Sequence, residues 1–80
     1  MDGSWDPDTR MMKFLHGTIL CGVSGEALED LAGATGLDRA GLQGVFQRYE
    51  QTIRLKAAQK IDAGEFQENG TVRILTADFA

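Results

Sequence analysis

The sequence contains few residues of the kinds that build catalytic, covalent or metal sites. Its 80 residues include one cysteine, one histidine and one proline. Cys21 has no second cysteine for a disulfide within the chain, and with His16 alone it does not supply the ligands of a usual zinc site. The sequence also lacks a signal-peptide pattern and an apolar run of roughly 20 residues, the length that spans a bilayer. We therefore expect a cytoplasmic protein without cofactor, metal or membrane contact.

Patterns typical of nucleotide binding and of nucleophilic catalysis are missing as well. The segment Gly33-Ala34-Thr35-Gly36 has neither the spacing nor the lysine of a phosphate-binding loop. His16 lies at an expected turn, and Cys21 lies on the apolar side of an expected strand, where a thiol behaves as a small hydrophobic group. We expect no enzymatic activity, and an enzyme using His16 with a carboxylate is the remotest alternative.

The remaining composition is that of one small soluble domain, residues 1–80. Hydrophobic residues make up 42% of the chain and charged residues 25%, which are ordinary values for a globular domain. So short a chain buries only about 60% of its unfolded surface, so a stability of roughly 3–5 kcal/mol is expected. We expect a monomer, or a weak homodimer through the long helix with the exposed Leu55 at its centre.

Alternating apolar residues predict three strands, at residues 10–15, 18–23 and 71–76. The first two are joined by the short turn His16-Gly17, which makes an antiparallel hairpin, and Asn69-Gly70 indicates a tight turn before the third. Residues 1–9 are polar and contain a proline between two aspartates. They are therefore predicted to form an N-terminal arm from which Trp5 docks back on the body.

Two helices are predicted between the second and third strands. Ser24 is the expected N-cap of the first helix. The glycines Gly33 and Gly36 are expected to end that helix. Asp38 is the expected N-cap of a second, long helix that runs to about Ala63. A narrow stripe on this helix holds Leu42, Phe46, Tyr49, Ile53 and Ala57. The resulting β-β-α-α-β order predicts an α+β fold, a small three-stranded antiparallel sheet covered on one face by two helices.

Several short motifs make the chain resemble a small uncharacterised bacterial family, a domain of unknown function. The residues that carry this resemblance are Trp5-Asp6, Phe14, Cys21, the run from Val23 to Leu28, and Phe46, Arg48, Ile53, Ala57 and Lys60 on the long helix. The turn at His16-Gly17 is shorter than the corresponding turn of the relatives. The resemblance covers nearly the whole chain and implies a two-layer α/β fold with no assigned activity.

Acidic side chains are concentrated in the first half of the chain, whose net charge as a whole is −4. From Met1 to Asp30, the acidic residues are Asp2, Asp6, Asp8, Glu26, Glu29 and Asp30, against only Arg10 and Lys13. One interpretation is a solvated surface. The other is that these residues bind a protein partner with a basic surface. In the most specific form of this second interpretation, the acidic side chains imitate the phosphates of nucleic acid. The protein would then inhibit a nucleic-acid-handling complex, as phage-encoded anti-CRISPR proteins do.

Residues 25–53 also show a weaker resemblance to the helix-turn-helix of bacterial transcription regulators. The spacing of Ala32, Gly36, Leu42 and Val45 matches that pattern. In this alternative the DNA-binding residues would be Arg39, Gln43, Gln47 and Arg48. The negative net charge and the glycines of the second helix oppose it, because a recognition helix must neutralise phosphates and reach bases. We therefore do not expect nucleic acid as a partner.

Overall fold

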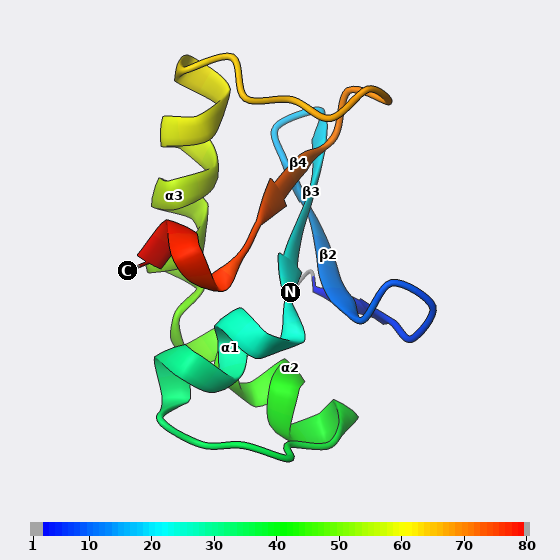
Figure 1. The fold of residues 1–80 in the computed structure, drawn as a ribbon, viewed down its shortest axis with the longest axis vertical. Coiled ribbons are helices and arrows are strands. Elements are labelled where there is room, and N and C mark those ends of the chain that lie inside the picture. The colour runs from blue at the N-terminus through cyan, green and yellow to red at the C-terminus, as the bar shows by residue number, and fades with distance from the viewer. Residues whose placement is uncertain (1–2, 80) are drawn as a thin grey trace.

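The computed structural model describes residues 3–79, and in these residues the chain forms a four-stranded sheet and three α-helices (Figure 1). The elements, in chain order, are β1 (Ser4–Asp6), β2 (Met11–His16), β3 (Ile19–Ser24), α1 (Gly25–Ala32), α2 (Arg39–Arg48), α3 (Glu50–Asp62), β4 (Val72–Ile74) and a short 3-10 helix, η1 (Thr76–Phe79). The strands lie in the order β1-β2-β3-β4. No helix of this described part is long and apolar enough to cross a membrane.

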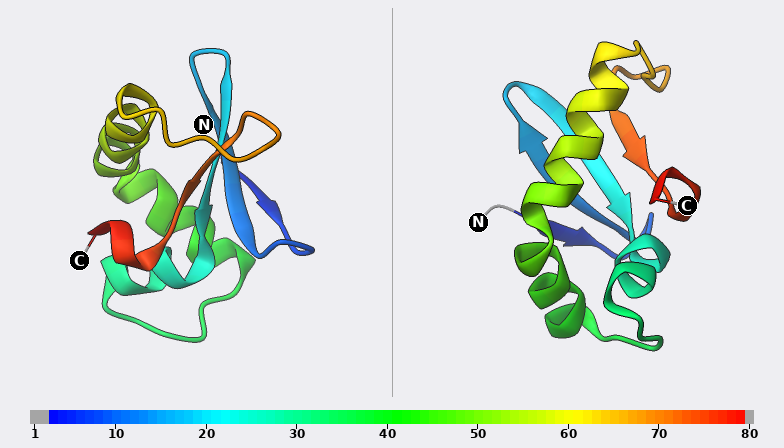
Figure 2. Two further views of the ribbon diagram at one scale, coloured as in Figure 1. Left: turned by 45° about the horizontal axis from the view of Figure 1, so that its top comes forward. Right: turned by 90° about the vertical axis from the view of Figure 1, so that its left-hand side faces the viewer.

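The helices lie on one face of the sheet. In Figure 2 (right), α3 and the end of α2 cross in front of the strands, and α1 lies beside the lower end of β3. The sheet residues that face the helices are buried: Met12 and Phe14 from β2, Cys21 and Val23 from β3, Val72 and Ile74 from β4. This alternation in β2 and β3, and the inward position of Val72 and Ile74, confirm the strand faces predicted from the sequence.

The centre of the core is an aromatic pair between the sheet and α2. The rings of Phe14 and Phe46 lie 5.3 Å apart at a tilted angle of 45°. Leu42, Ile53 and Ala57 of the predicted helical stripe are also buried. The stripe therefore marks the buried side of the helical segment, as its spacing predicted.

The prediction of three antiparallel strands is wrong in two respects. Residues 4–6 of the predicted arm form β1, which pairs antiparallel with β2 and places Trp5 opposite Met12. The last strand, β4, pairs parallel with β3. A parallel neighbour requires a long crossover, and the helices α1 to α3 supply it. The arm was not recognised as a strand because it is short and carries a proline directly after Asp6.

The single long helix predicted between Asp38 and Ala63 is divided into α2 and α3. Tyr49 separates them with φ −107° and ψ 18°, which lies in the sparsely occupied bridge region. Its amide still donates to the Val45 carbonyl and its carbonyl accepts from Ile53, so the break is a bend. The bend lets both halves of the stripe reach one compact core, which a straight helix of this length does not.

The helix ends follow the predicted capping. The Ser24 hydroxyl accepts from the Ala27 amide at 3.0 Å, and the Asp38 carboxylate accepts from Gly41 at 2.8 Å. Gly33 ends α1 in the left-handed conformation with φ 68°, which glycine adopts without a steric cost.

Candidate interaction surface

The face of the sheet opposite the helices is uncovered. We call it the outer sheet face and define it by the outward side of β2, β3 and β4, together with the residue directly after β4: Met11, Lys13, Leu15, Leu20, Gly22, Arg73 and Leu75. Its leucines are exposed by 56% at Leu15, 39% at Leu20 and 42% at Leu75. Exposed apolar side chains gathered on one face indicate an interaction site more than scattered ones do.

The strand register places two cations in one row across this face. Lys13 pairs with Gly22, and Gly22 pairs in turn with Arg73. Since neighbouring strands are about 4.8 Å apart, the two cationic residues stand about 10 Å apart at their backbones. Gly22 has no side chain, so the cations flank a low point in the middle of the sheet.

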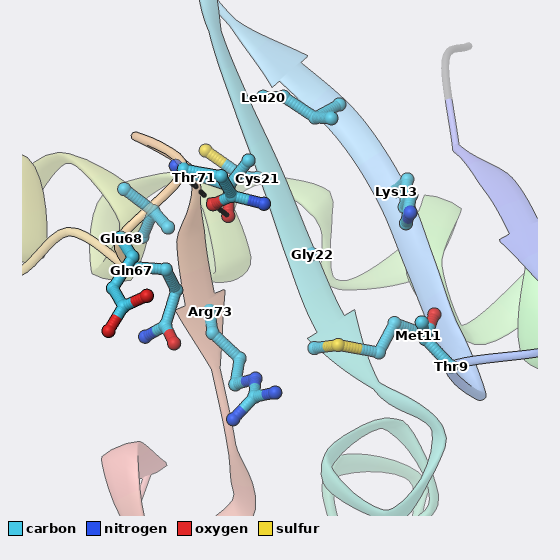
Figure 3. Close-up of a pocket in the computed structure, with 12 residues that line it drawn as sticks. Thr9, Met11, Lys13, Leu20, Cys21, Gly22, Gln67, Glu68, Thr71 and Arg73 are labelled. Atoms are coloured by element: carbon cyan, nitrogen blue, oxygen red, sulfur yellow. Dashed lines mark hydrogen bonds between the residues drawn. The ribbon is translucent and has the colours of Figure 1, made fainter.

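A shallow open depression of about 510 Å³ lies over this row. Met11 forms part of its floor, because a Cβ placed on Gly22 would meet the Met11 methyl at 3.4 Å and its sulfur at 3.5 Å. Leu20 and residues 67–69, from the loop before β4, also line it. Figure 3 shows Lys13, Met11 and Arg73 on the side of the sheet away from the helices, with Gln67 and Glu68 beside β4.

The two cations of the row differ in their partners. Lys13 Nζ lies 3.0 Å from the Asp6 carboxylate. The hydrogen bond from Lys13, together with those from the Asp8 amide and the Thr9 hydroxyl, lowers the pKa of Asp6 below its ordinary value. Among residues 3–79, no carboxylate lies within ion-pair distance of Arg73, which is exposed. The guanidinium therefore keeps its donors available.

Cys21 lies behind the depression but is only 1% exposed. Its thiol faces the core, and burial raises its pKa, so it stays protonated at neutral pH. The described residues hold no group of three or more potential metal ligands. The chemistry offered by this surface is therefore apolar contact combined with charged hydrogen-bond donors.

Two of the predicted acidic residues have partners within the chain. Asp6 is engaged by Lys13, and Glu29 accepts a hydrogen bond from the Leu37 amide at 3.0 Å, which ties α1 to the following loop. Asp8 and Asp30 are exposed. Asp2 lies outside the described residues. Glu26 lines a second shallow depression together with Arg10 and Arg73, so cations stand among the acidic side chains at this end of the sheet.

The residues of the DNA-binding alternative lie along α2. Arg39 and Gln47 are exposed, Arg48 lies over the Tyr49 ring at 5.6 Å, and Gln43 donates to the Gly3 carbonyl at 2.9 Å. Gln43 thus holds the N-terminal strand in place. The connection between α1 and α2 covers residues 33–38, longer than the roughly 3–4 residues of a typical helix-turn-helix.

The outer sheet face was not identified from the sequence. A glycine in the middle of a strand indicates a close approach or an open site, and Gly22 was therefore a usable signal. The turn predicted at His16-Gly17 would set Lys13 opposite Leu20, whereas the observed turn at residues 17–18 pairs His16 with Ile19 and Lys13 with Gly22. The third member of the row, Arg73, could not be placed, because the parallel pairing of β4 with β3 was not foreseen.

Comparison with known proteins identifies a family of unknown function. A family model described as "Protein of unknown function (DUF1488)" matches residues 3–74. A solved structure from Shewanella loihica PV-4, described as a protein of unknown function from the same family, superposes with a TM-score of 0.81 at 21% identity. That match covers 90% of this chain and 84% of the other. No curated protein matches. The structural likeness shows a shared fold.

Proposed function

The chain belongs to the DUF1488 family of proteins of unknown function, and we propose that it is a non-catalytic interaction protein that binds a protein partner through the outer sheet face. The observation that carries the proposal is the uncovered sheet itself. Its inner side is packed against the helices, whereas its outer side carries exposed leucines around an open depression.

The composition of this face supports binding of a protein. Partner-binding surfaces combine apolar side chains at their centre with arginine and a polar rim. Here Met11 and Leu20 line the depression together with Arg73, while Gln67 and Glu68 stand at its edge. Met11 is only 9% exposed, and its flexible, polarisable side chain forms the floor on which an incoming group would rest.

We place the contact on the sheet, in preference to the acidic N-terminal half, for a specific reason. Two members of the acidic set, Asp6 and Glu29, already engage their carboxylates in contacts within the chain. Using them for a partner would break these contacts. On the outer sheet face, Arg73 requires no such rearrangement, because it has no ion-pair partner among residues 3–79, whereas Lys13 is paired with Asp6.

Affinity capture with a matched pair of variants tests the proposal. Leu15 and Leu55 are exposed to similar extents, 56% and 61%, but Leu15 lies on the outer sheet face and Leu55 on α3. Tagged wild-type protein, Leu15→Lys and Leu55→Lys would be incubated with nuclease-treated host lysate, and captured proteins quantified by mass spectrometry. We expect one protein to be captured by the wild type and by Leu55→Lys but lost with Leu15→Lys.

The reverse pattern, in which only Leu55→Lys loses the captured protein, would refute the assignment to the sheet and favour α3. Capture that disappears after nuclease treatment of the lysate would mean that nucleic acid is the ligand. Circular dichroism of both variants provides the control that each remains folded. Because both leucines are exposed, we expect stabilities within about 0.5 kcal/mol of the wild type.

A further inference from the structure

The row Lys13–Gly22–Arg73 indicates the chemical class of the segment that a protein partner would place on the outer sheet face. The inference below rests on the proposed function. We infer that the outer sheet face receives an acidic segment of a protein partner. In this segment, an aliphatic side chain packs on Met11 and a neighbouring carboxylate is bound by Arg73 and Lys13.

The first argument comes from the layout of charge and apolar surface. The cationic row lies between two rows with exposed leucines. On one side Leu15 is paired with Leu20, and on the other Met11 is paired with Ser24, with Leu75 directly after the end of β4. A ligand that fits this layout has a negative group at its centre and aliphatic groups beside it. An acidic side chain flanked by aliphatic residues has that composition.

The second argument concerns the geometry of the two cations. A carboxylate has two oxygens and accepts hydrogen bonds from several donors at once. An arginine offers a planar fork that matches the carboxylate, and a lysine offers a mobile point charge. Arg73 has no ion-pair partner among residues 3–79, and Lys13 reaches the same carboxylate over the side-chain-free Gly22 by exchanging Asp6 for the ligand. Glu68 lines the same depression but lies beyond ion-pair distance of Arg73, so this position is not already filled by the chain's own carboxylate.

Other occupants of the face fit less well. A second copy of the chain, packed sheet against sheet, would bury Lys13 and Arg73 of both copies near the centre of the interface, and buried charges are costly unless they are fully paired. Single-stranded nucleic acid binds sheet faces chiefly by stacking on aromatic side chains, and none of the residues that define the outer sheet face is aromatic. The net charge of −4 also opposes a polyanion as long as nucleic acid.

Peptide selection on the full chain tests the inference directly. Random short peptides displayed on phage would be selected against the tagged protein, and an enriched peptide would be synthesised with a fluorophore. We expect the enriched peptides to combine acidic with aliphatic residues. Arg73→Gln should weaken binding of the labelled peptide about tenfold or more, because it removes a charge-assisted contact. Binding should also weaken as salt is raised.

Two further variants complete the design. Arg39→Gln removes an exposed arginine from α2 and should leave peptide binding unchanged. Gly22→Ala adds a methyl group whose nearest neighbours all belong to Met11, at 3.4 Å or more, which is ordinary van der Waals contact, so the protein should remain folded. The added methyl raises the floor of the depression, and we expect weaker peptide binding with an unchanged melting temperature.

Several results would overturn the inference. These are the absence of any enriched peptide, enrichment of basic peptides, or equal binding by Arg73→Gln and the wild type. Binding of a single-stranded DNA oligonucleotide, or dimerisation in sedimentation experiments, would overturn it as well if Arg73→Gln abolished either. If Leu15→Lys abolishes partner capture while Arg73→Gln does not, the sheet face remains the interface and only the acidic chemistry is wrong.

Discussion

Replacing Gly3 with alanine tests whether the N-terminal segment is part of the folded core. A Cβ at position 3 would lie 2.8 Å from Cδ2 and 2.9 Å from Cε2 of Phe46, and 3.0 Å from Cγ of Met12. Phe46 is fully buried and packs on Phe14, so its ring has no free space to enter. The substitution therefore overpacks the core.

The magnitude follows from two opposing contributions. Overpacking of a filled core costs about 1–3 kcal/mol. Replacing glycine with alanine also restricts the unfolded chain, and this stabilises the folded state by about 0.4–1 kcal/mol. The net loss is about 1–2 kcal/mol. For a domain of this size each kcal/mol shifts the melting temperature by about 4–8 °C, so Gly3→Ala should lower it by about 4–16 °C.

A second glycine provides a control with the opposite sign. Gly44 lies inside α2, and a Cβ placed there would have no atom within 4 Å. Because glycine is about 1 kcal/mol less favourable than alanine within a helix, Gly44→Ala should raise the melting temperature by about 4–8 °C. The two variants contain the same chemical change, so a loss at position 3 beside a gain at position 44 shows that the surroundings of Gly3, and not alanine itself, destabilise Gly3→Ala.

Thermal unfolding followed by circular dichroism measures both shifts, and fluorescence gives an independent readout. The only tryptophan, Trp5, lies on β1 and packs against the core. If Gly3→Ala displaces β1, the Trp5 emission should move to longer wavelength. A Gly3→Ala protein with unchanged melting temperature and unchanged emission would refute the reasoning. It would show that residues 3–6 behave as the loose arm expected from the sequence.

Three further changes test contacts elsewhere in the fold. Ser24→Ala removes the oxygen that caps α1 and should cost about 1 kcal/mol in chemical unfolding; an unchanged midpoint would mean that the cap adds nothing. Although burial favours the protonated acid, the Leu75 amide and Lys60 together lower the pKa of Asp78 below its ordinary value. The stability that this carboxylate adds is therefore present above the unfolded pKa and is lost as the pH falls through the folded value. Between about pH 6 and about pH 2, the urea midpoint should fall less for Asp78→Asn than for the wild type, and equal falls would contradict this assignment. Arg54→Met removes a cation that lies 5.2 Å from the Phe14 ring centroid and donates to a carbonyl of β2; it should cost about 1–2 kcal/mol in urea unfolding, and a cost near zero would show that the methylene stem supplies the stabilisation.

Local features of the chain were predictable because they depend on neighbouring residues. The caps at Ser24 and Asp38 and the left-handed glycine that ends α1 each involve atoms only a few residues apart. The buried faces of β2 and of the helical segment follow from periodicity, which records which side chains share one side. Membership of an uncharacterised family was also visible in these short motifs, and the family match confirms it.

The sheet topology depended on contacts between distant segments. The segment of β1 is short and polar, and only its pairing with β2 together with the contact between Gly3 and the Phe46 ring makes it a strand. The bend at Tyr49 could not be predicted from a helix-breaking residue, because there is no proline or glycine at that position. It arises where one amphipathic segment must cover a small curved core, which is a property of the packed structure.

The sequence by itself determined the caps, the strand and helix faces and the absence of an evident catalytic motif, since these follow from residue type and spacing. Only the tertiary structure decided which residues share a surface. It engaged Asp6 and Glu29 in contacts within the chain, and it brought Arg73 into one row with Lys13 through the parallel pairing of β4. The physical reason is that periodicity fixes the side of an element on which a residue lies, whereas register and crossover fix its neighbours across the sheet.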